Sequence, residues 1–144
     1  MIRNFIALAI SAASLSAFAQ MSPVGLWKTI DDDGKTEKSL VRITDQGGVL
    51  TGTVEKIFDA SKADAKCEKC TDDRKDKPVT GMAIIRNVKQ DADDKEIWGG
   101  GEILDPNNGK TYKTRLKPVE GGKKMEMRGY IGFMYRTQVW QRVE

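Results

Sequence analysis

The chain contains 144 residues, 31% of them charged, with 24 Lys and Arg against 21 Asp and Glu and a net charge of +3. It has no histidine, which excludes histidine-based catalytic triads and imidazole metal ligands. Basic and acidic residues are interleaved throughout, a pattern typical of a solvated surface rather than of a nucleic-acid interface.

Residues 1–19 have the composition of a secretory signal peptide. Arg3 supplies a positive start, an apolar stretch follows from Phe5 to Leu15, and Ala17-Phe18-Ala19 has the small-x-small pattern of a cleavage site. The apolar stretch is shorter than the roughly 20 residues that cross a bilayer, so an uncleaved membrane anchor is the weaker alternative. We predict cleavage near Ala19 and Gln20, no membrane span, and a periplasmic or secreted bacterial protein.

The remaining residues, 20–144, are enough for one domain with a buried core. Short segments rich in β-formers alternate with turns rich in Gly, Asp, Asn and Pro, and no amphipathic helix of useful length occurs. Gly52, inside the third segment, predicts a bulge. The predicted strands are residues 25–30, 38–44, 49–58, 79–88, 96–104, 111–118, 124–131 and 134–143.

Eight consecutive strands joined mostly by tight turns predict an all-β fold. Closing such a meander on itself removes the exposed edges, and eight strands leave an interior just wide enough for side chains or one small ligand. We therefore expect an eight-stranded antiparallel up-and-down barrel, with an open sandwich as the alternative.

The segment from Asp59 to Pro78 interrupts the strand pattern and predicts one long loop, with a short helical turn near residues 60–65. It contains Cys67-Glu68-Lys69-Cys70. A redox-active pair usually lies at a helix start in a βαβ unit, and a zinc site needs about four ligands, neither of which this sequence offers. A structural disulfide is the favoured interpretation in an oxidising compartment, and a redox switch stays open.

Several short motifs, in this order and spacing, resemble a family of exported bacterial proteins catalogued as domain of unknown function family 2147. The resemblance covers Ser22 to Arg142 and implies a lipocalin-like or calycin-like barrel with no reaction attached. The matching pieces are Gly25-Leu26-Trp27, Leu50-Thr51-Gly52, Pro78 to Met82, Trp98 with Gly101, Leu104 to Tyr112, Arg128 to Gly132, and Trp140-Gln141-Arg142.

Gly25 and Trp27 open the first strand, whereas Trp140 and Arg142 end the last one. If these strands pair antiparallel, the four residues meet at one end of the barrel. They either form a binding site or close that end structurally, with Arg142 stacked on Trp27 as a cation–π pair of about 0.5–2 kcal/mol. We favour structural closure, which directs the search for a ligand to the opposite end.

Polar and aromatic residues at strand positions are the candidates for lining a ligand site. Alternation places Trp98 on the face of Glu102, and Arg128 on the face of Tyr130. The alternative is that the arginines lie on the outer wall or pair with carboxylates. The candidates are Trp98, Glu102, Tyr112, Arg128, Tyr130 and Arg136.

No catalytic residue, metal site or cofactor is predicted. Asp105 precedes a proline in a turn, so it is expected to bond its own backbone rather than act with Glu102. We predict a non-enzymatic protein that carries a small apolar or amphipathic molecule, with an anionic headgroup met by Arg128 or Arg136. The alternative is a structural or interaction protein of the cell envelope with a filled barrel. The sequence does not specify an oligomeric state.

Overall fold

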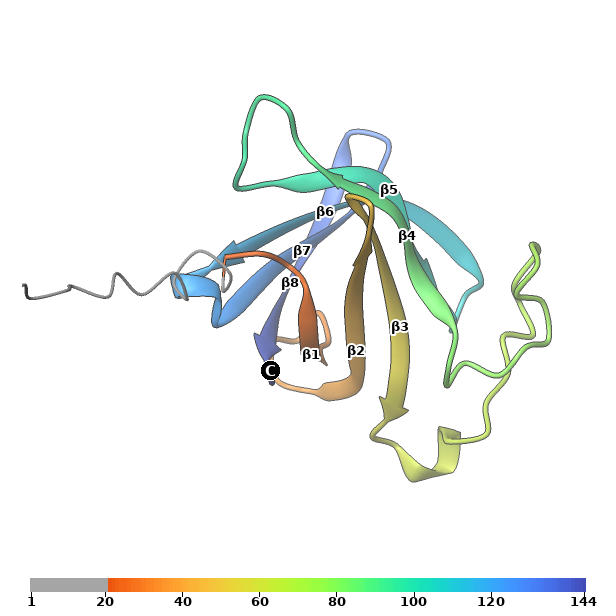
Figure 1. Cartoon of the computed structure of the whole chain (residues 1–144). Coiled ribbons are helices and arrows are strands. Elements are labelled where there is room, and N and C mark those ends of the chain that lie inside the picture. Colours follow the sequence, from red (N-terminus) through yellow and green to blue (C-terminus); the bar gives the residue numbers. More distant parts are fainter. Residues whose placement is uncertain (1–20) are drawn as a thin grey trace, which may run out of the picture.

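The computed structural model describes residues 21–144, so the predicted signal peptide lies outside the described part of the chain. These residues form eight strands and two short 3-10 helices (Figure 1). Within them, no helix is long and apolar enough to cross a membrane. The elements are β1 (Gly25–Ile30), β2 (Glu37–Gln46), β3 (Val49–Ile57), η1 (Ala60–Lys62), β4 (Ala83–Gln90), β5 (Trp98–Asp105), β6 (Lys110–Val119), η2 (Glu120–Gly122), β7 (Lys124–Ile131) and β8 (Met134–Arg142).

Each strand pairs antiparallel with the next, and β8 returns to pair with β1. Trp27 lies opposite Arg142 and Lys28 opposite Gln141 in this closing ladder. The prediction of a closed eight-stranded barrel is confirmed, and the open sandwich is wrong. Closure satisfies the backbone groups of both outer strands, which an open meander would leave exposed.

The fourth strand was predicted to begin at Val79, but β4 begins at Ala83. Residues 79–82 instead form a turn in which the Gly81 amide donates to the Val54 carbonyl at 2.7 Å. The hydrophobic pattern was misleading here because Val79 and Met82 are buried in the core although they lie in a turn and not in a strand. The fifth strand likewise begins at Trp98 rather than at residue 96.

The barrel has two distinct ends. At the closed end lie the start of β1, the end of β8, and the β2–β3, β4–β5 and β6–β7 connections. At the other end, here called the mouth, lie the β1–β2 turn, the long β3–β4 loop (residues 58–82), the β5–β6 turn and the β7–β8 turn. In Figure 1 the β3–β4 loop extends well to one side of the strands.

Large inward side chains fill the half of the barrel near the closed end. Cross-strand partners share a face, and alternate residues of β2, β3 and β7 are buried together. Full burial of each such side chain contributes about 1.5–3 kcal/mol. The side chains that are almost fully buried include Trp27, Val41, Ile43, Leu50, Ile85, Val88, Leu116, Met125 and Trp140.

Glycines in the strands allow the barrel to curve. The β3–β4 register shifts on both sides of Gly52, which confirms the predicted bulge. A side chain at Gly52 would place its Cβ 2.9 Å from the side chain of Ile85. The absence of a side chain therefore makes room for a large core residue of the neighbouring strand.

Arg142 links the chain ends at the closed end. Its guanidinium lies 4.3 Å above the Trp27 ring and donates to the carbonyl oxygens of Val24 (2.8 Å), Ser22 (2.5 Å) and Gly122 (2.5 Å). Burial lowers the pKa of this guanidinium. The Trp27 indole donates to the Pro23 carbonyl at 2.7 Å. One cation thus fixes the N-terminal segment, the β6–β7 turn and β8 together.

We predict that Arg142→Leu lowers the free energy of unfolding by about 3 kcal/mol, because several carbonyls lose a charged donor at once. Arg142→Lys retains the charge but not the planar, multidentate guanidinium, so it should recover only part of the loss. Chemical denaturation of the two variants and the wild type measures the difference. Wild-type stability of the leucine variant would contradict this role.

Candidate functional site

A hollow of about 380 Å³ opens at the mouth. Its floor is apolar and is formed by inward residues of β4, β5, β7 and β8. These floor residues are Ile84, Ile103, Met127 and Trp140. Because the half of the barrel beyond Trp140 is filled, the hollow is a shallow cup rather than a channel.

A network of hydrogen bonds forms the polar rim of this hollow. The Asp32 carboxylate, in the β1–β2 turn, accepts from Arg136 at 3.1 Å and from the Gln138 amide at 2.8 Å. The Gln138 side-chain carbonyl in turn accepts from the Trp140 indole at 3.0 Å. On β2, the Lys38 ammonium lies 3.8 Å from the Asp31 carboxylate. The rim therefore carries both signs of charge in pairs.

A second hollow, of about 460 Å³, lies beside the first under the long loop. Both hollows reach Ser39, Ile84 and Asn107, so they adjoin at the mouth. The second is lined on its inner side by Val54, Ile57, Ala65 and Val79. The long loop thus supplies an apolar wall that the eight strands do not provide.

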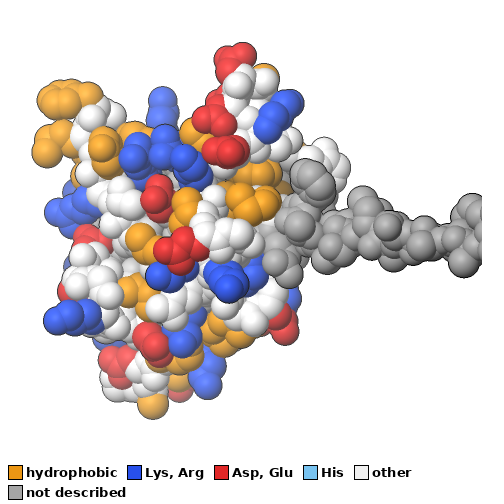
Figure 2. All heavy atoms as spheres, turned by 90° about the vertical axis from the view of Figure 1, so that its left-hand side faces the viewer, with side chains coloured by type: hydrophobic (Ala, Val, Ile, Leu, Met, Phe, Trp, Pro, Cys, Tyr) orange, Lys and Arg blue, Asp and Glu red, His pale blue; other side chains and the backbone are white. Residues whose placement is uncertain are grey.

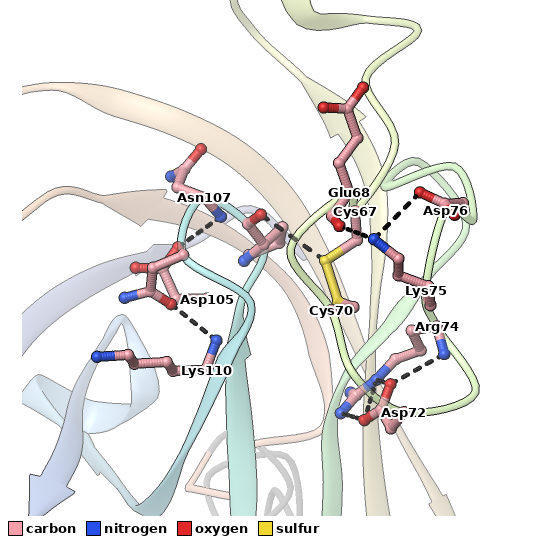
Figure 3. The surroundings of a disulfide bond; sticks show 12 residues. Cys67, Glu68, Cys70, Asp72, Arg74, Lys75, Asp76, Asp105, Asn107 and Lys110 are labelled. Carbon is pink, nitrogen blue, oxygen red and sulfur yellow. Dashed lines mark hydrogen bonds and ion pairs between the residues drawn. A yellow bond between two sulfur atoms is a disulfide. The ribbon is translucent and has the colours of Figure 1, made fainter.

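A disulfide joins Cys67 and Cys70, with their Cα atoms 5.4 Å apart (Figure 3). Both residues are buried, and the Cys67 sulfur lies 3.7 Å from the Pro106 carbonyl oxygen in the β5–β6 turn. A side chain at Gly109 would place its Cβ 2.0 Å from the Lys69 carbonyl oxygen. The disulfide loop therefore packs directly on the β5–β6 turn and holds one wall of the mouth.

Arg74 anchors the rest of the long loop to the barrel. Its buried guanidinium donates to the Ala83 carbonyl at 2.8 Å and pairs with the Asp72 carboxylate at 2.5 Å (Figure 3). Hydrogen bonds from Arg74 lower the pKa of Asp72 to about 2. Arg86 of β4 makes a second tie through two 3.0 Å hydrogen bonds to Asp73. These contacts fix the loop against β4.

Two of the six ligand candidates lie at the mouth. Tyr112 packs against the core and lines the first hollow, and its hydroxyl accepts a hydrogen bond from the Asn108 amide at 2.9 Å. Arg136 lies at the rim, paired with Asp32 and largely exposed. Both side chains therefore border the space that a ligand in the first hollow would occupy.

Trp98 packs against the core at the closed end. It is the first residue of β5, and the odd-numbered strands all begin at that end. It therefore does not share the mouth with Tyr112, and the prediction that placed both toward the ligand entrance is wrong for Trp98. It also does not share a face with Glu102. The β5–β6 register shifts between Trp98 and Gly101, and Gly100 takes a φ of +74°, so the alternation breaks at this bulge.

Glu102, Arg128 and Tyr130 lie on the outer face of the barrel, not in the interior. Met125 and Met127 are the buried residues of β7, and Arg128 and Tyr130 have the opposite alternation. Glu102 pairs with Lys113, next to the inward pair of Ile103 and Tyr112. The outer-wall alternative therefore holds for Arg128.

Asp32 and Gln138 are the rim residues that the sequence did not single out. Asp32 belongs to the Asp-rich hairpin turn, where a turn-forming role explained its presence. The one available signal was that Gln138 lies at alternate positions with Arg136 and Trp140 in the last strand, so that all three side chains share a face. As expected, Asp105 bonds its own turn, accepting from the Asn107 amide at 2.9 Å. Within residues 21–144, no three Cys, Asp or Glu residues are grouped to hold a metal ion.

We predict that Gly109→Ala destabilises the protein far more than Gly34→Ala. Both glycines have a φ of +72°, so both alanines incur the left-handed backbone cost of about 1–2 kcal/mol. Only at Gly109 must the backbone of the disulfide loop also move, since nothing lies within 4 Å of a Cβ at Gly34. Thermal unfolding of the two variants tests this, and equal losses would show that the loop does not pack on the turn.

Burial of both sulfurs predicts that the disulfide resists reduction in the native state. Incubation with dithiothreitol, followed by alkylation and mass spectrometry, should show slow reduction in buffer and fast reduction in urea. Similar rates under both conditions would favour the redox-switch interpretation over a structural disulfide.

Comparisons with known proteins agree with this fold. One solved structure with the same fold is protein HP1028 from Helicobacter pylori, described as belonging to the lipocalin family, with a TM-score of 0.72 and 20% sequence identity. The match covers 85% of this chain and 84% of that one, and it shows the fold alone. A search of curated proteins gave no match. The family model described as "Uncharacterized protein conserved in bacteria (DUF2147)" matches residues 25–142, and the chain therefore belongs to this bacterial family, with a lipocalin-like barrel.

Proposed function

We propose that the protein is an exported, non-enzymatic carrier that binds one small amphipathic molecule at the mouth of its barrel. The observation behind this proposal is the first hollow, which combines an apolar floor with a hydrogen-bonding rim. Small-molecule sites typically have this composition and a volume of about 300–1,000 Å³. Eight-stranded barrels of this type are wide enough for one small ligand.

The filled half of the barrel limits the size of the ligand. Trp27, Leu116 and Met125 occupy the interior below Trp140 with no measurable exposure, so the apolar part of a ligand ends at the Trp140 ring. A long acyl chain would have to turn sideways into the second hollow beneath the β3–β4 loop. The first hollow alone suits a compact ring or a short chain.

The rim favours a neutral or zwitterionic headgroup. Arg136 is paired with Asp32, and Lys38 with Asp31, so a bound anion would have to compete with a carboxylate for either cation. Arg128 points away from the interior. The anionic headgroup suggested by Arg128 and Arg136 is therefore not part of the proposal.

The alternative is an envelope protein that acts only through its surface. The dense packing of the closed half favours this alternative, because most of the interior is occupied by side chains. The two hypotheses differ in one measurable property, which is specific binding in the hollow at the mouth.

Gly129 offers a way to block that hollow without straining the backbone. It lines the first hollow, and a Cβ there would meet only Tyr112, at an ordinary 3.7 Å. We predict that Gly129→Leu abolishes binding of the apolar probe N-phenyl-1-naphthylamine, measured by its fluorescence and by quenching of tryptophan emission. Thr137→Leu, on the exposed face of the adjoining strand, should bind as the wild type does.

Native mass spectrometry of protein purified from the periplasm provides an independent measurement. The carrier proposal predicts a bound small molecule in the wild type and none in Gly129→Leu. Wild-type protein that is consistently empty, together with equal probe binding by both leucine variants, would reject the carrier and favour the surface-acting alternative.

A further inference from the structure

The turn between β7 and β8 exposes a continuous apolar segment, here called the hairpin tip and comprising residues 131–135. The exposed fractions are 60% for Ile131, 95% for Phe133, 65% for Met134 and 53% for Tyr135. Figure 2 shows hydrophobic side chains projecting at the upper left, where this turn lies, with Lys and Arg side chains beside them. Contiguous apolar side chains on a projecting turn mark a contact surface, because single exposed hydrophobic residues are otherwise scattered.

A group of unneutralised cations lies on the outer face next to the tip. Arg115 of β6 is directly opposite Arg128 of β7, an arrangement of like charges that destabilises a sheet. Within residues 21–144, neither guanidinium has a carboxylate within 4 Å, and the buried Nε of each has no hydrogen-bond partner. The acidic residue nearest along β7, Glu126, is opposite Lys117. A bound anion would neutralise this pair.

Two tyrosines lie between the apolar tip and the cations. The rings of Tyr130 and Tyr135 pack with their centroids 5.6 Å apart, and the Arg128 guanidinium lies 4.3 Å from the Tyr135 ring. Hydrogen bonding to Tyr130 raises the pKa of Arg128. The order from the tip inward is therefore apolar, then tyrosine, then arginine. Proteins at a membrane interface present the same order to the acyl chains, the interface and the headgroups.

We propose that the hairpin tip inserts shallowly into a lipid leaflet, with Arg115 and Arg128 bound to the phosphates of anionic headgroups. Phe133 and Met134 enter the acyl-chain boundary, and Tyr130 and Tyr135 lie at the headgroup level. The two arginines lie on the outer wall, away from the ligand hollow, whereas Ile131 at the base of the tip also lines that hollow.

A second copy of the chain suits this surface less well than a membrane does. A twofold contact through the tips would bring the two arginine pairs toward each other, and like charges across an interface cost free energy. Pairing through strand edges is unavailable to the described strands because the barrel is closed. An anionic bilayer supplies both an apolar interior and compensating charge.

Vesicle co-sedimentation of the mature chain tests the proposal. The wild type should bind vesicles that contain phosphatidylglycerol more tightly than vesicles of phosphatidylcholine alone, and added salt should weaken the difference. Phe133→Ser with Met134→Ser should reduce partitioning at least about tenfold on both vesicle types. Arg115→Gln with Arg128→Gln should reduce it roughly 20-fold on anionic vesicles only.

A matched charge control is Lys89→Gln with Lys123→Gln, which removes two exposed cations at the closed end and should retain most of the binding. Phe133→Trp gives a direct readout, since its emission should shift to the blue when vesicles are added. Equal binding by the wild type, the tip variant and the arginine variant would overturn the proposal. A wild-type dimer that dissociates in the tip variant without vesicles would overturn it in favour of self-association.

Discussion

The stacking of Arg142 on Trp27 joins the two ends of the chain and closes the barrel. The guanidinium lies over the indole ring while its N–H groups satisfy carbonyls of the N-terminal segment and of the β6–β7 turn. Gly25 is part of the same arrangement, because a Cβ there would lie 2.4 Å from the Glu144 carbonyl oxygen. The closed end therefore combines buried charge, hydrogen bonding and tight backbone contact, and side chains fill its interior.

Different interactions hold the opposite end of the barrel together. There the long β3–β4 loop lines the second hollow with its apolar residues Ala65 and Val79. The loop contains little regular structure, so its position depends on the disulfide, on the buried Arg74 and on contact with Gly109. The filled interior at the closed end and the loop wall at the mouth explain why the two hollows of the barrel interior lie at the mouth.

The fold was predictable from the sequence because its signals are local and repetitive. Alternating β-formers and Asp-Gly or Asn-Gly turns locate most strands to within a few residues. The inward face was much harder to predict, since a single bulge reverses the alternation. Gly100 does this between Trp98 and Glu102, and no feature of the sequence shows on which side the reversal occurs. Arg128 and Tyr130 share a face, as predicted. That this face is the outer one follows from the burial of the methionines at the alternate positions of β7.

The closing ladder has a consequence for the order of folding. Trp27 and Arg142 are among the first and last residues of the barrel, so the contact that completes it spans nearly the whole sequence. Contacts of long sequence separation are formed slowly, because the entropy of closing the loop must be lost before they contribute. The β1 to β7 meander cannot bury Trp27 under Arg142 until β8 is present. Until β8 pairs with β1, both β1 and β7 lack a neighbour on one side, so the docking of β8 is the step that closes the barrel.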